Sequence, residues 1–192
     1  LKAAFVGLFL FLVVYLFVVF LWASSVAGEM LAKASSPEQA IRLQPRHVQA
    51  LLKVEDPTFH QHPGLNISRG QGVTTISSVL ARDVFLGKHD ADGIPGAMQS
   101  FYRGVFHCCR KVDLGRDVMA LVLDARATKQ QQLNLYVAST YFGSWGGKGV
   151  VGFEAAAHAY YAKDLSQLTD REFYGLMAMP MAPNRYYPVR NP

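Results

Sequence analysis

The segment LLKVEDPTFHQHPG, residues 51–64, gathers side chains that could move protons or hold a ligand. Glu55 and Asp56 stand side by side at the end of an apolar run, and His60 and His62 follow shortly after. A carboxylate in such a place can act as a general base, or it can be an ordinary charged residue at a helix end. The two histidines lack the spacing of three or four that ligand pairs on a helix have, and no third ligand accompanies them. The segment therefore predicts no metal site.

A second candidate for chemistry is GQGVTTISS, residues 70–78, which has the glycine and hydroxyl content of a phosphate-binding loop. It lacks the Gly-Lys-Ser/Thr ending that holds phosphates and magnesium in a P-loop, so it predicts no nucleotide site. Cys108 and Cys109 are adjacent, and no CxxC pair is present. Because a disulfide between neighbouring residues is strained, we interpret the two cysteines as semi-buried thiols.

The charge balance limits the possible partners of the chain. A net charge of +5 and a pI near 9.3 suit an anionic membrane surface, a phosphorylated substrate or nucleic acid. The sequence contains no zinc-finger spacing, no RNP aromatic motif and no recognition helix flanked by clustered basic residues. It therefore predicts no nucleic-acid partner.

An uncharged run, AAFVGLFLFLVVYLFVVFLWA, occupies residues 3–23. Its length suits a hydrocarbon core of about 30 Å, and it exceeds the ~7–15 apolar residues of a signal-peptide core. Trp22 stands where an interfacial aromatic belongs, and Lys2 favours a cytoplasmic N-terminus with an exported body. The alternative is a signal cleaved after SSVAGE. We predict one transmembrane helix and divide the chain into an anchor at 1–25, a stalk at 26–46 and a domain at 47–192.

Helical periodicity dominates the rest of the chain. The segment SSPEQAIRLQ has the signature of a helix start, with Ser36, Pro37 and Glu38 opening a turn. Apolar residues recur at helical intervals in RHVQALLKVED, VTTISSVLARDVFLGK, GRDVMALVLDARATKQQQLNLYVAST, GFEAAAHAYYAK and TDREFYGLMAMP. The third of these predicts two helices that meet near residues 127–128, and Thr169 caps the last. No convincing strand pattern appears, so we expect a mainly α body.

Taken in order, the segments resemble the peptidoglycan glycosyltransferase family, the lipid II polymerases found alone or at the N-terminus of bifunctional penicillin-binding proteins. The resemblance covers residues 48–192 and rests on EDPTFHQHPG, GVTTISSVLARDVFL, an RK pair, MALVLDARATKQQQLNLY, GFEAAAHAYYAKDLSQL and LMAMPMAPNRYYPVRNP. It implies a mainly α, lysozyme-like fold behind one transmembrane helix. It also implies an enzyme of the bacterial inner membrane, with its body on the exported side, that joins lipid II into β-1,4 glycan strands.

The resemblance assigns the catalytic base to Glu55. This carboxylate would take the proton of a sugar 4-hydroxyl as it attacks an anomeric carbon that carries a lipid pyrophosphate, and partial burial would raise its pKa toward working pH. The departing pyrophosphate needs cations rather than an acid. No cofactor is required, and a divalent cation, Mg²⁺ or Mn²⁺, is compatible with the chemistry. The implied substrate contacts are Asp56, Phe59, His62, Thr74, Thr75, Arg82, Arg110, Lys111, Arg126 and Lys129.

The second glutamate of the family is replaced in this chain. Counting from Arg110 reaches Leu114, and counting back from MALVLDAR reaches Arg116, so neither register gives an acid. Asp113 and Asp117 each lie one residue away and are candidate catalytic replacements with a shorter reach. The loss leaves an alternative function open. The domain could be a degenerate glycosyltransferase-like subunit that acts as an accessory or scaffold in a membrane protein complex.

A long spacer, Gly87 to Cys109, joins two of the matching segments. Apolar residues recur at helical intervals in its MQSFYRGVFHCC half, which predicts a helix against a membrane interface or a partner helix. The alternative is an extra core helix. We predict that at least two of Phe101, Tyr102, Val105 and Phe106 contact lipid or another protein chain.

Overall fold

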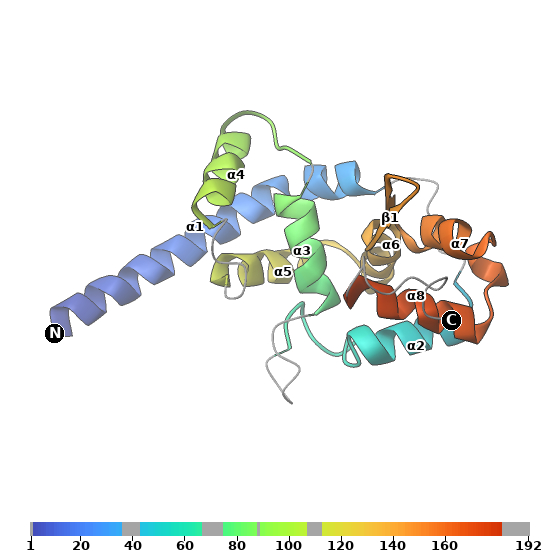
Figure 1. The fold of residues 1–192 in the computed structure, drawn as a ribbon. Coiled ribbons are helices and arrows are strands. Elements are labelled where there is room, and N and C mark those ends of the chain that lie inside the picture. Colours follow the sequence, from blue (N-terminus) through green and yellow to red (C-terminus); the bar gives the residue numbers. More distant parts are fainter. Residues whose placement is uncertain (1, 36–42, 67–74, 88, 107–112, 182–192) are drawn as a thin grey trace. The chain divides into compact units, whose positions relative to one another are not determined.

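The computed structural model describes residues 2–35, 43–66, 75–87, 89–106 and 113–181 (Figure 1). The chain separates into two compact units. The first unit comprises Leu1–Ser36 with Phe59–Gln132, and the second comprises Pro37–Thr58 with Leu133–Pro192. Helices make up most of both units, which confirms the expected mainly α fold.

Helix α1, Lys2–Ala34, is the longest element of the first unit. Its N-terminal part is apolar and exposed, whereas its later part packs against α3, Ile76–Leu86, and α5, Leu114–Arg126. Among the described helices, α1 alone is long and apolar enough to cross a membrane. The residues of α1 that are buried in the protein are Val19, Trp22, Ala23, Val26, Ala27 and Met30.

The segment predicted to be a stalk begins inside this helix. Helix α1 continues to Ala34, and Val26 and Met30 pack into the unit. The sequence is less apolar after residue 23 because only one face of α1 is buried in this part of the helix. The other face carries Glu29 and Lys33, whose charged groups pair at 2.6 Å. The helix start predicted at 36–38 lies outside the described residues, and the domain boundaries stay predictions.

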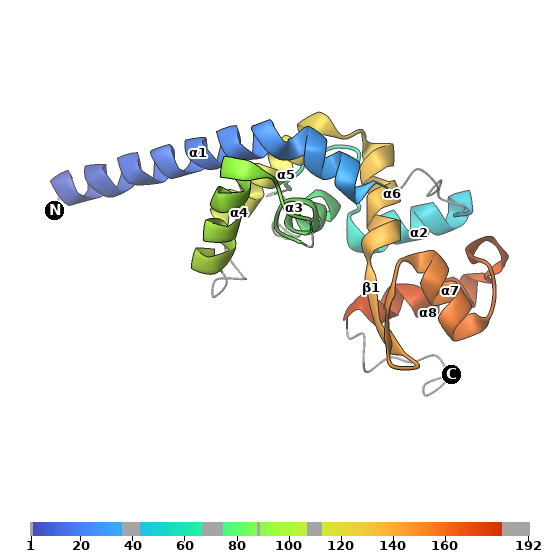
Figure 2. The ribbon, with the colours of Figure 1, turned by 90° about the horizontal axis from the view of Figure 1, so that it is seen from above.

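Helix α4, Gly93–Phe106, confirms that the long spacer contains a helix. Figures 1 and 2 both place α4 beside α1, and two hydrogen bonds join them. The indole N–H of Trp22 donates to the Pro95 carbonyl at 3.0 Å, and the hydroxyl of Tyr15 donates to that of Tyr102 at 3.3 Å. Gln99 is fully buried and donates to the Phe85 carbonyl at 2.6 Å, which attaches α4 to the end of α3.

The second unit contains most of the remaining elements: α2, Pro45–Glu55; β1, Tyr141–Trp145; β2, Lys148–Val151; α7, Phe153–Tyr161; η1, Leu165–Gln167; α8, Asp170–Ala178; and η2, Met179–Met181. Helix α6, Lys129–Ser139, leads into them. Three phenylalanine rings form the centre of this unit. Phe153 lies 4.8 Å from Phe142 and 5.8 Å from Phe173, measured between ring centres. His47 stacks on Phe173 at 4.2 Å, which anchors α2 on α8.

The expectation that no strand is present was wrong. Strands β1 and β2 form an antiparallel hairpin in which Tyr141 pairs with Val151 and Trp145 with Lys148. The turn uses Gly146 and Gly147, whose φ angles of 57° and 79° favour glycine. The register shifts between Tyr141 and Ser144, so the alternation that identifies a strand in a sequence is broken here.

Candidate active site

The predicted site residues are divided between the two units. Glu55 and Asp56 belong to the second unit. The first unit holds the other described candidates, which are Phe59, His62, Thr75, Arg82, Asp113, Asp117, Arg126 and Lys129. Thr74, Arg110 and Lys111 lie outside the described residues, as do the two cysteines.

Glu55 is the last residue of α2. The helix ends here because Asp56 precedes Pro57, and a residue before proline is driven out of the helical region; Asp56 has φ −157° and ψ 78°. The Glu55 carboxyl group is partly buried and hydrogen-bonded to the Tyr136 side chain of α6. Burial raises the pKa of Glu55 above its ordinary value, and the hydrogen bond with Tyr136 opposes this rise. A carboxylate with a raised pKa can accept a proton nearer neutral pH.

Lys129, at the start of α6, contacts two of the other predicted substrate-binding residues in the first unit. Its ammonium group donates to the carbonyl of His62 at 2.9 Å and lies 4.7 Å from the centre of the Phe59 ring. It also donates to the carboxylate of Asp124, on α5, at 2.5 Å. The Lys129 side chain is only 23% exposed, so most of its hydrogen-bonding capacity is used inside the protein.

Asp124 is the residue of this cluster that the sequence analysis missed. The same carboxylate oxygen accepts from the Gln132 amide at 2.9 Å, and Ser77 donates to the Gln132 amide oxygen at 2.6 Å. Ser77 and Gln132 are both fully buried. The signal in the sequence was an acid inside an otherwise apolar helical run. The helix break at 127–128 lies between Asp124 and Lys129, so helical spacing alone could not reveal that they meet.

Thr75 and His62 serve the local structure of the first unit. The Thr75 hydroxyl caps α3, accepting from the Ser78 backbone N–H at 3.1 Å, and donates to the Gly64 carbonyl at 2.6 Å. The Gly64 N–H donates to the His62 ring at 3.1 Å. Gly64 has φ 102°, and a Cβ there would lie 2.5 Å from the Ala120 carbonyl oxygen. The glycine after His62-Pro63 therefore lets this loop pack closely on α5.

Two arginines of the first unit lie on its surface. Arg82 on α3 and Arg126 in the last turn of α5 are both exposed. Arg82 is 62% exposed, and its guanidinium group makes a long contact, 3.5 Å, with the neighbouring Asp83. Their guanidinium groups are accessible to an anionic ligand.

The two candidate replacements for the missing glutamate differ in their surroundings. Asp113 caps α5, accepting from the Arg116 N–H at 3.0 Å, and it also accepts a hydrogen bond from the hydroxyl of Tyr102. Asp117 stands in the first turn of α5. Burial raises the pKa of Asp117, and within the described residues one of its carboxylate oxygens is buried with no hydrogen-bond partner. Asp113 has a structural role, whereas Asp117 retains a free acceptor.

A comparison with known families decides where the chain belongs. The profile of the family described as Transglycosylase matches residues 28–192, which is most of the sequence. The chain belongs to the transglycosylase family. The match begins within α1, and of the buried residues of that helix it includes Met30. The resemblance found in the sequence is thereby confirmed, and nothing in the comparisons supports a degenerate scaffold.

Three bacterial relatives show how far the sequence of this chain has diverged from those of known proteins. Penicillin-binding protein 1F of Bacillus subtilis is 29% identical over 147 residues, covering 75% of this chain and 19% of its own length. Penicillin-binding protein 1B of Vibrio cholerae is 29% identical over 174 residues, with coverage of 81% and 20%. Penicillin-binding protein 1A of Pseudomonas aeruginosa is 28% identical over 159 residues, with coverage of 76% and 17%. This transglycosylase-family chain thus spans about a fifth of the length of these relatives.

Proposed function

We propose that this chain is a membrane-anchored peptidoglycan glycosyltransferase that polymerises lipid II into β-1,4 glycan strands. The observation that carries the proposal is the position and burial of Glu55. It lies at the end of α2, it is partly buried, and its pKa is raised, as a base working near neutral pH requires. The match to the transglycosylase family supports the same assignment.

In the proposed reaction, Glu55 accepts the proton of the acceptor sugar's 4-hydroxyl. The oxygen freed of this proton forms a bond to the anomeric carbon of the donor sugar. The bond from that carbon to the lipid pyrophosphate breaks, and its electron pair leaves with the pyrophosphate. Because the leaving group departs as an anion, it needs cationic stabilisation and no proton.

We assign the cations of the first unit to different tasks. Lys129 is already paired with Asp124 and bonded to the His62 carbonyl, so it orders the loop that follows Phe59. The exposed Arg82 and Arg126 can form forked hydrogen bonds to pyrophosphate oxygens. Asp117 is our choice for the second carboxylate, since the Asp113 side chain is occupied by the α5 cap and Tyr102. A divalent cation at the pyrophosphate stays a prediction.

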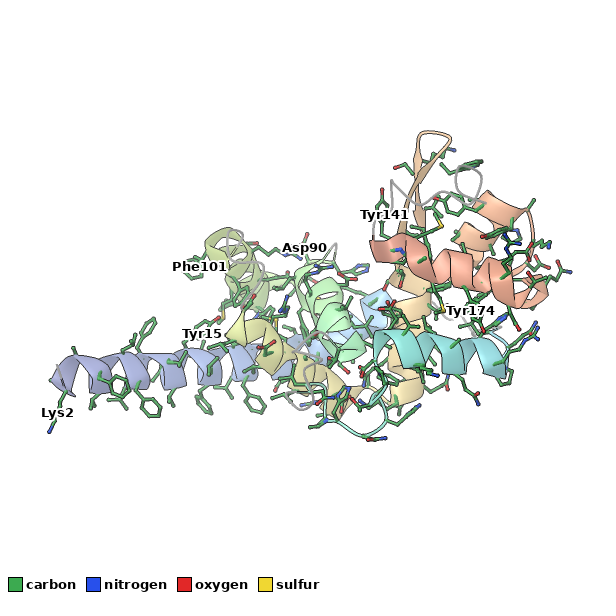
Figure 3. The ribbon with its side chains drawn as sticks, turned by 60° about the horizontal axis from the view of Figure 1, so that its bottom comes forward. Lys2, Tyr15, Asp90, Phe101, Tyr141 and Tyr174 are labelled. Atoms are coloured by element: carbon green, nitrogen blue, oxygen red, sulfur yellow. The ribbon has the colours of Figure 1, made fainter. Side chains whose placement is uncertain are left out.

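We further propose that α1 anchors the chain in the bacterial inner membrane and that the outer face of α4 meets the same lipid. Most large apolar side chains between residues 5 and 21 of α1 are exposed. On α4, Ile94, Met98 and Phe101 recur at helical spacing and are 80%, 39% and 73% exposed. Figure 3 labels Phe101 on this helix. Tyr102 instead faces the protein, at 7% exposed, so it does not contribute to this lipid-facing surface. Val105 is 49% exposed, and the Phe106 side chain lies outside what the structure describes.

The decisive experiment is lipid II polymerisation by the purified chain and its Glu55→Gln variant. The amide keeps the shape of the side chain but cannot accept the proton, so we expect polymerisation to fall by about 10²–10⁴-fold. Circular dichroism and lipid II binding should stay unchanged. Asp92→Asn, a change at a 95% exposed carboxylate, is the matched control and should retain activity. Full activity of Glu55→Gln would remove Glu55 from the reaction, and an inactive parent protein would overturn the enzyme assignment.

A further inference from the structure

A second group of chemically active side chains lies in the second unit, on α7 and the turn after it. Glu154 and His158 are four residues apart on α7 and so share a face. Asp164 follows the helix. Each of the three residues offers one ligating atom, a histidine ring nitrogen or a carboxylate oxygen, and these atoms all lie within 4.8 Å of one another. In the searched part of the chain, which excludes the undescribed segments, no other such group of three His, Cys, Asp or Glu residues occurs.

The end of α7 brings Asp164 back to the helix. Ala162 adopts the left-handed conformation, with φ 53°, and its N–H donates to the His158 carbonyl at 3.1 Å. The chain therefore reverses direction here instead of continuing the helix. One oxygen of Glu154 also accepts from the Leu165 N–H at 3.4 Å, so the carboxylate is oriented toward the turn.

The distances within the group suit a shared ion as well as direct ion pairs between His158 and the two carboxylates. His158 Nε2 lies 3.3 Å from Glu154 Oε1 and 3.5 Å from Asp164 Oδ1. A charge-assisted N–H···O bond measures about 2.7–2.9 Å, and one N–H can point well at only one acceptor. Nitrogen and oxygen ligands at about 2.0–2.2 Å from a zinc ion stand roughly 3.0–3.5 Å from each other. The two separations match that range, and the third, between the carboxylate oxygens of Glu154 and Asp164, is no more than 4.8 Å.

The charge of the group also favours a cation. With His158 neutral, the two carboxylates carry two negative charges. Lys163 lies between them in the sequence, but its ammonium group pairs with Glu172 at 2.6 Å. Across the described residues, neither Glu154 nor Asp164 is paired with a lysine or arginine.

We propose that Glu154, His158 and Asp164 bind one divalent transition-metal ion, with Zn²⁺ as the best match to one imidazole and two carboxylates. Water would fill the remaining positions, since all three side chains are about half exposed. The ion would fix the end of α7 to the turn that leads into η1. This site uses none of the residues assigned to glycan polymerisation, so the metal-site proposal can be tested independently of the proposed function.

Equilibrium dialysis of the full chain in detergent against Zn²⁺ tests the site. We expect one ion that the parent protein binds and that His158→Gln binds at least ten-fold more weakly. His60→Gln removes another exposed histidine of the same chain and should leave this affinity unchanged. Asp164→Asn is a second variant that should also weaken binding, and circular dichroism checks that each variant is folded. Equal Zn²⁺ affinity in the parent, His158→Gln and Asp164→Asn, or no binding by the parent, would overturn the proposal.

Discussion

Removing the charge of Asp124 should cost the first unit a large part of its stability. The change Asp124→Asn leaves the Lys129 ammonium without its anion and weakens the acceptor for Gln132. Breaking a fully buried ion pair costs about 3–5 kcal/mol, and breaking an exposed one costs about 0–1 kcal/mol. The Lys129 and Asp124 side chains are 23% and 15% exposed, nearer the buried limit. Because the asparagine oxygen still accepts weakly, we expect a loss of about 2–3 kcal/mol.

Urea unfolding of the detergent-purified protein measures this loss. Asp83→Asn is the matched control, because the Arg82–Asp83 contact is 3.5 Å long between side chains that are 62% and 38% exposed. Its cost should stay below about 1 kcal/mol. A double-mutant cycle with Lys129→Met should give a coupling free energy of about 1–3 kcal/mol. The reasoning is refuted if Asp124→Asn costs no more than Asp83→Asn, or if the two changes at Asp124 and Lys129 are additive.

Two further outcomes follow from single contacts. Tyr136→Phe removes the hydroxyl that holds down the pKa of Glu55, so burial acts unopposed and that pKa rises. A base must be ionised to work, so the acidic side of the pH–rate profile of polymerisation should move to higher pH. An unchanged profile would show that Tyr136 does not influence the reaction through Glu55. Gly64→Ala forces a Cβ to within 2.5 Å of the Ala120 carbonyl at φ 102°, which should cost at least about 1–3 kcal/mol and lower Tm. Gly28→Ala, with no atom within 4 Å of the new Cβ, is its control, and equal Tm values would contradict the packing argument.

Structural features that depend on residues close together in the sequence could be predicted from the sequence. The Asp56–Pro57 step ends α2 at Glu55, and the Thr169 side chain exchanges hydrogen bonds with Glu172 to open α8. The helix boundary at 127–128 is likewise a local signal, and the structure has it between Arg126 and Lys129.

Features that depend on distant partners could not be predicted. Asp113 and Asp117 look equivalent in the sequence, and only the Tyr102 hydroxyl and the α5 cap distinguish them. Asp124 looks like a surface acid until Gln132 and Lys129 are placed around it. The hairpin was missed because its glycines and its shifted register remove the alternation that marks strands.

Helix α1 combines an exposed apolar part with a part that is buried in the first unit, and this affects how the protein folds. Trp22, Val26 and Met30 belong to the core that α3 and α5 complete, although they follow directly on the apolar run. Proteolytic removal of a leader near Gly28 would strip Trp22 and Val26 from that core. If α1 anchors the chain as proposed above, membrane insertion and folding use the same helix, and we expect the first unit to finish folding only while this helix stays attached. A soluble fragment that starts after residue 35 should expose the contact surfaces of α3 and α5 and aggregate during expression.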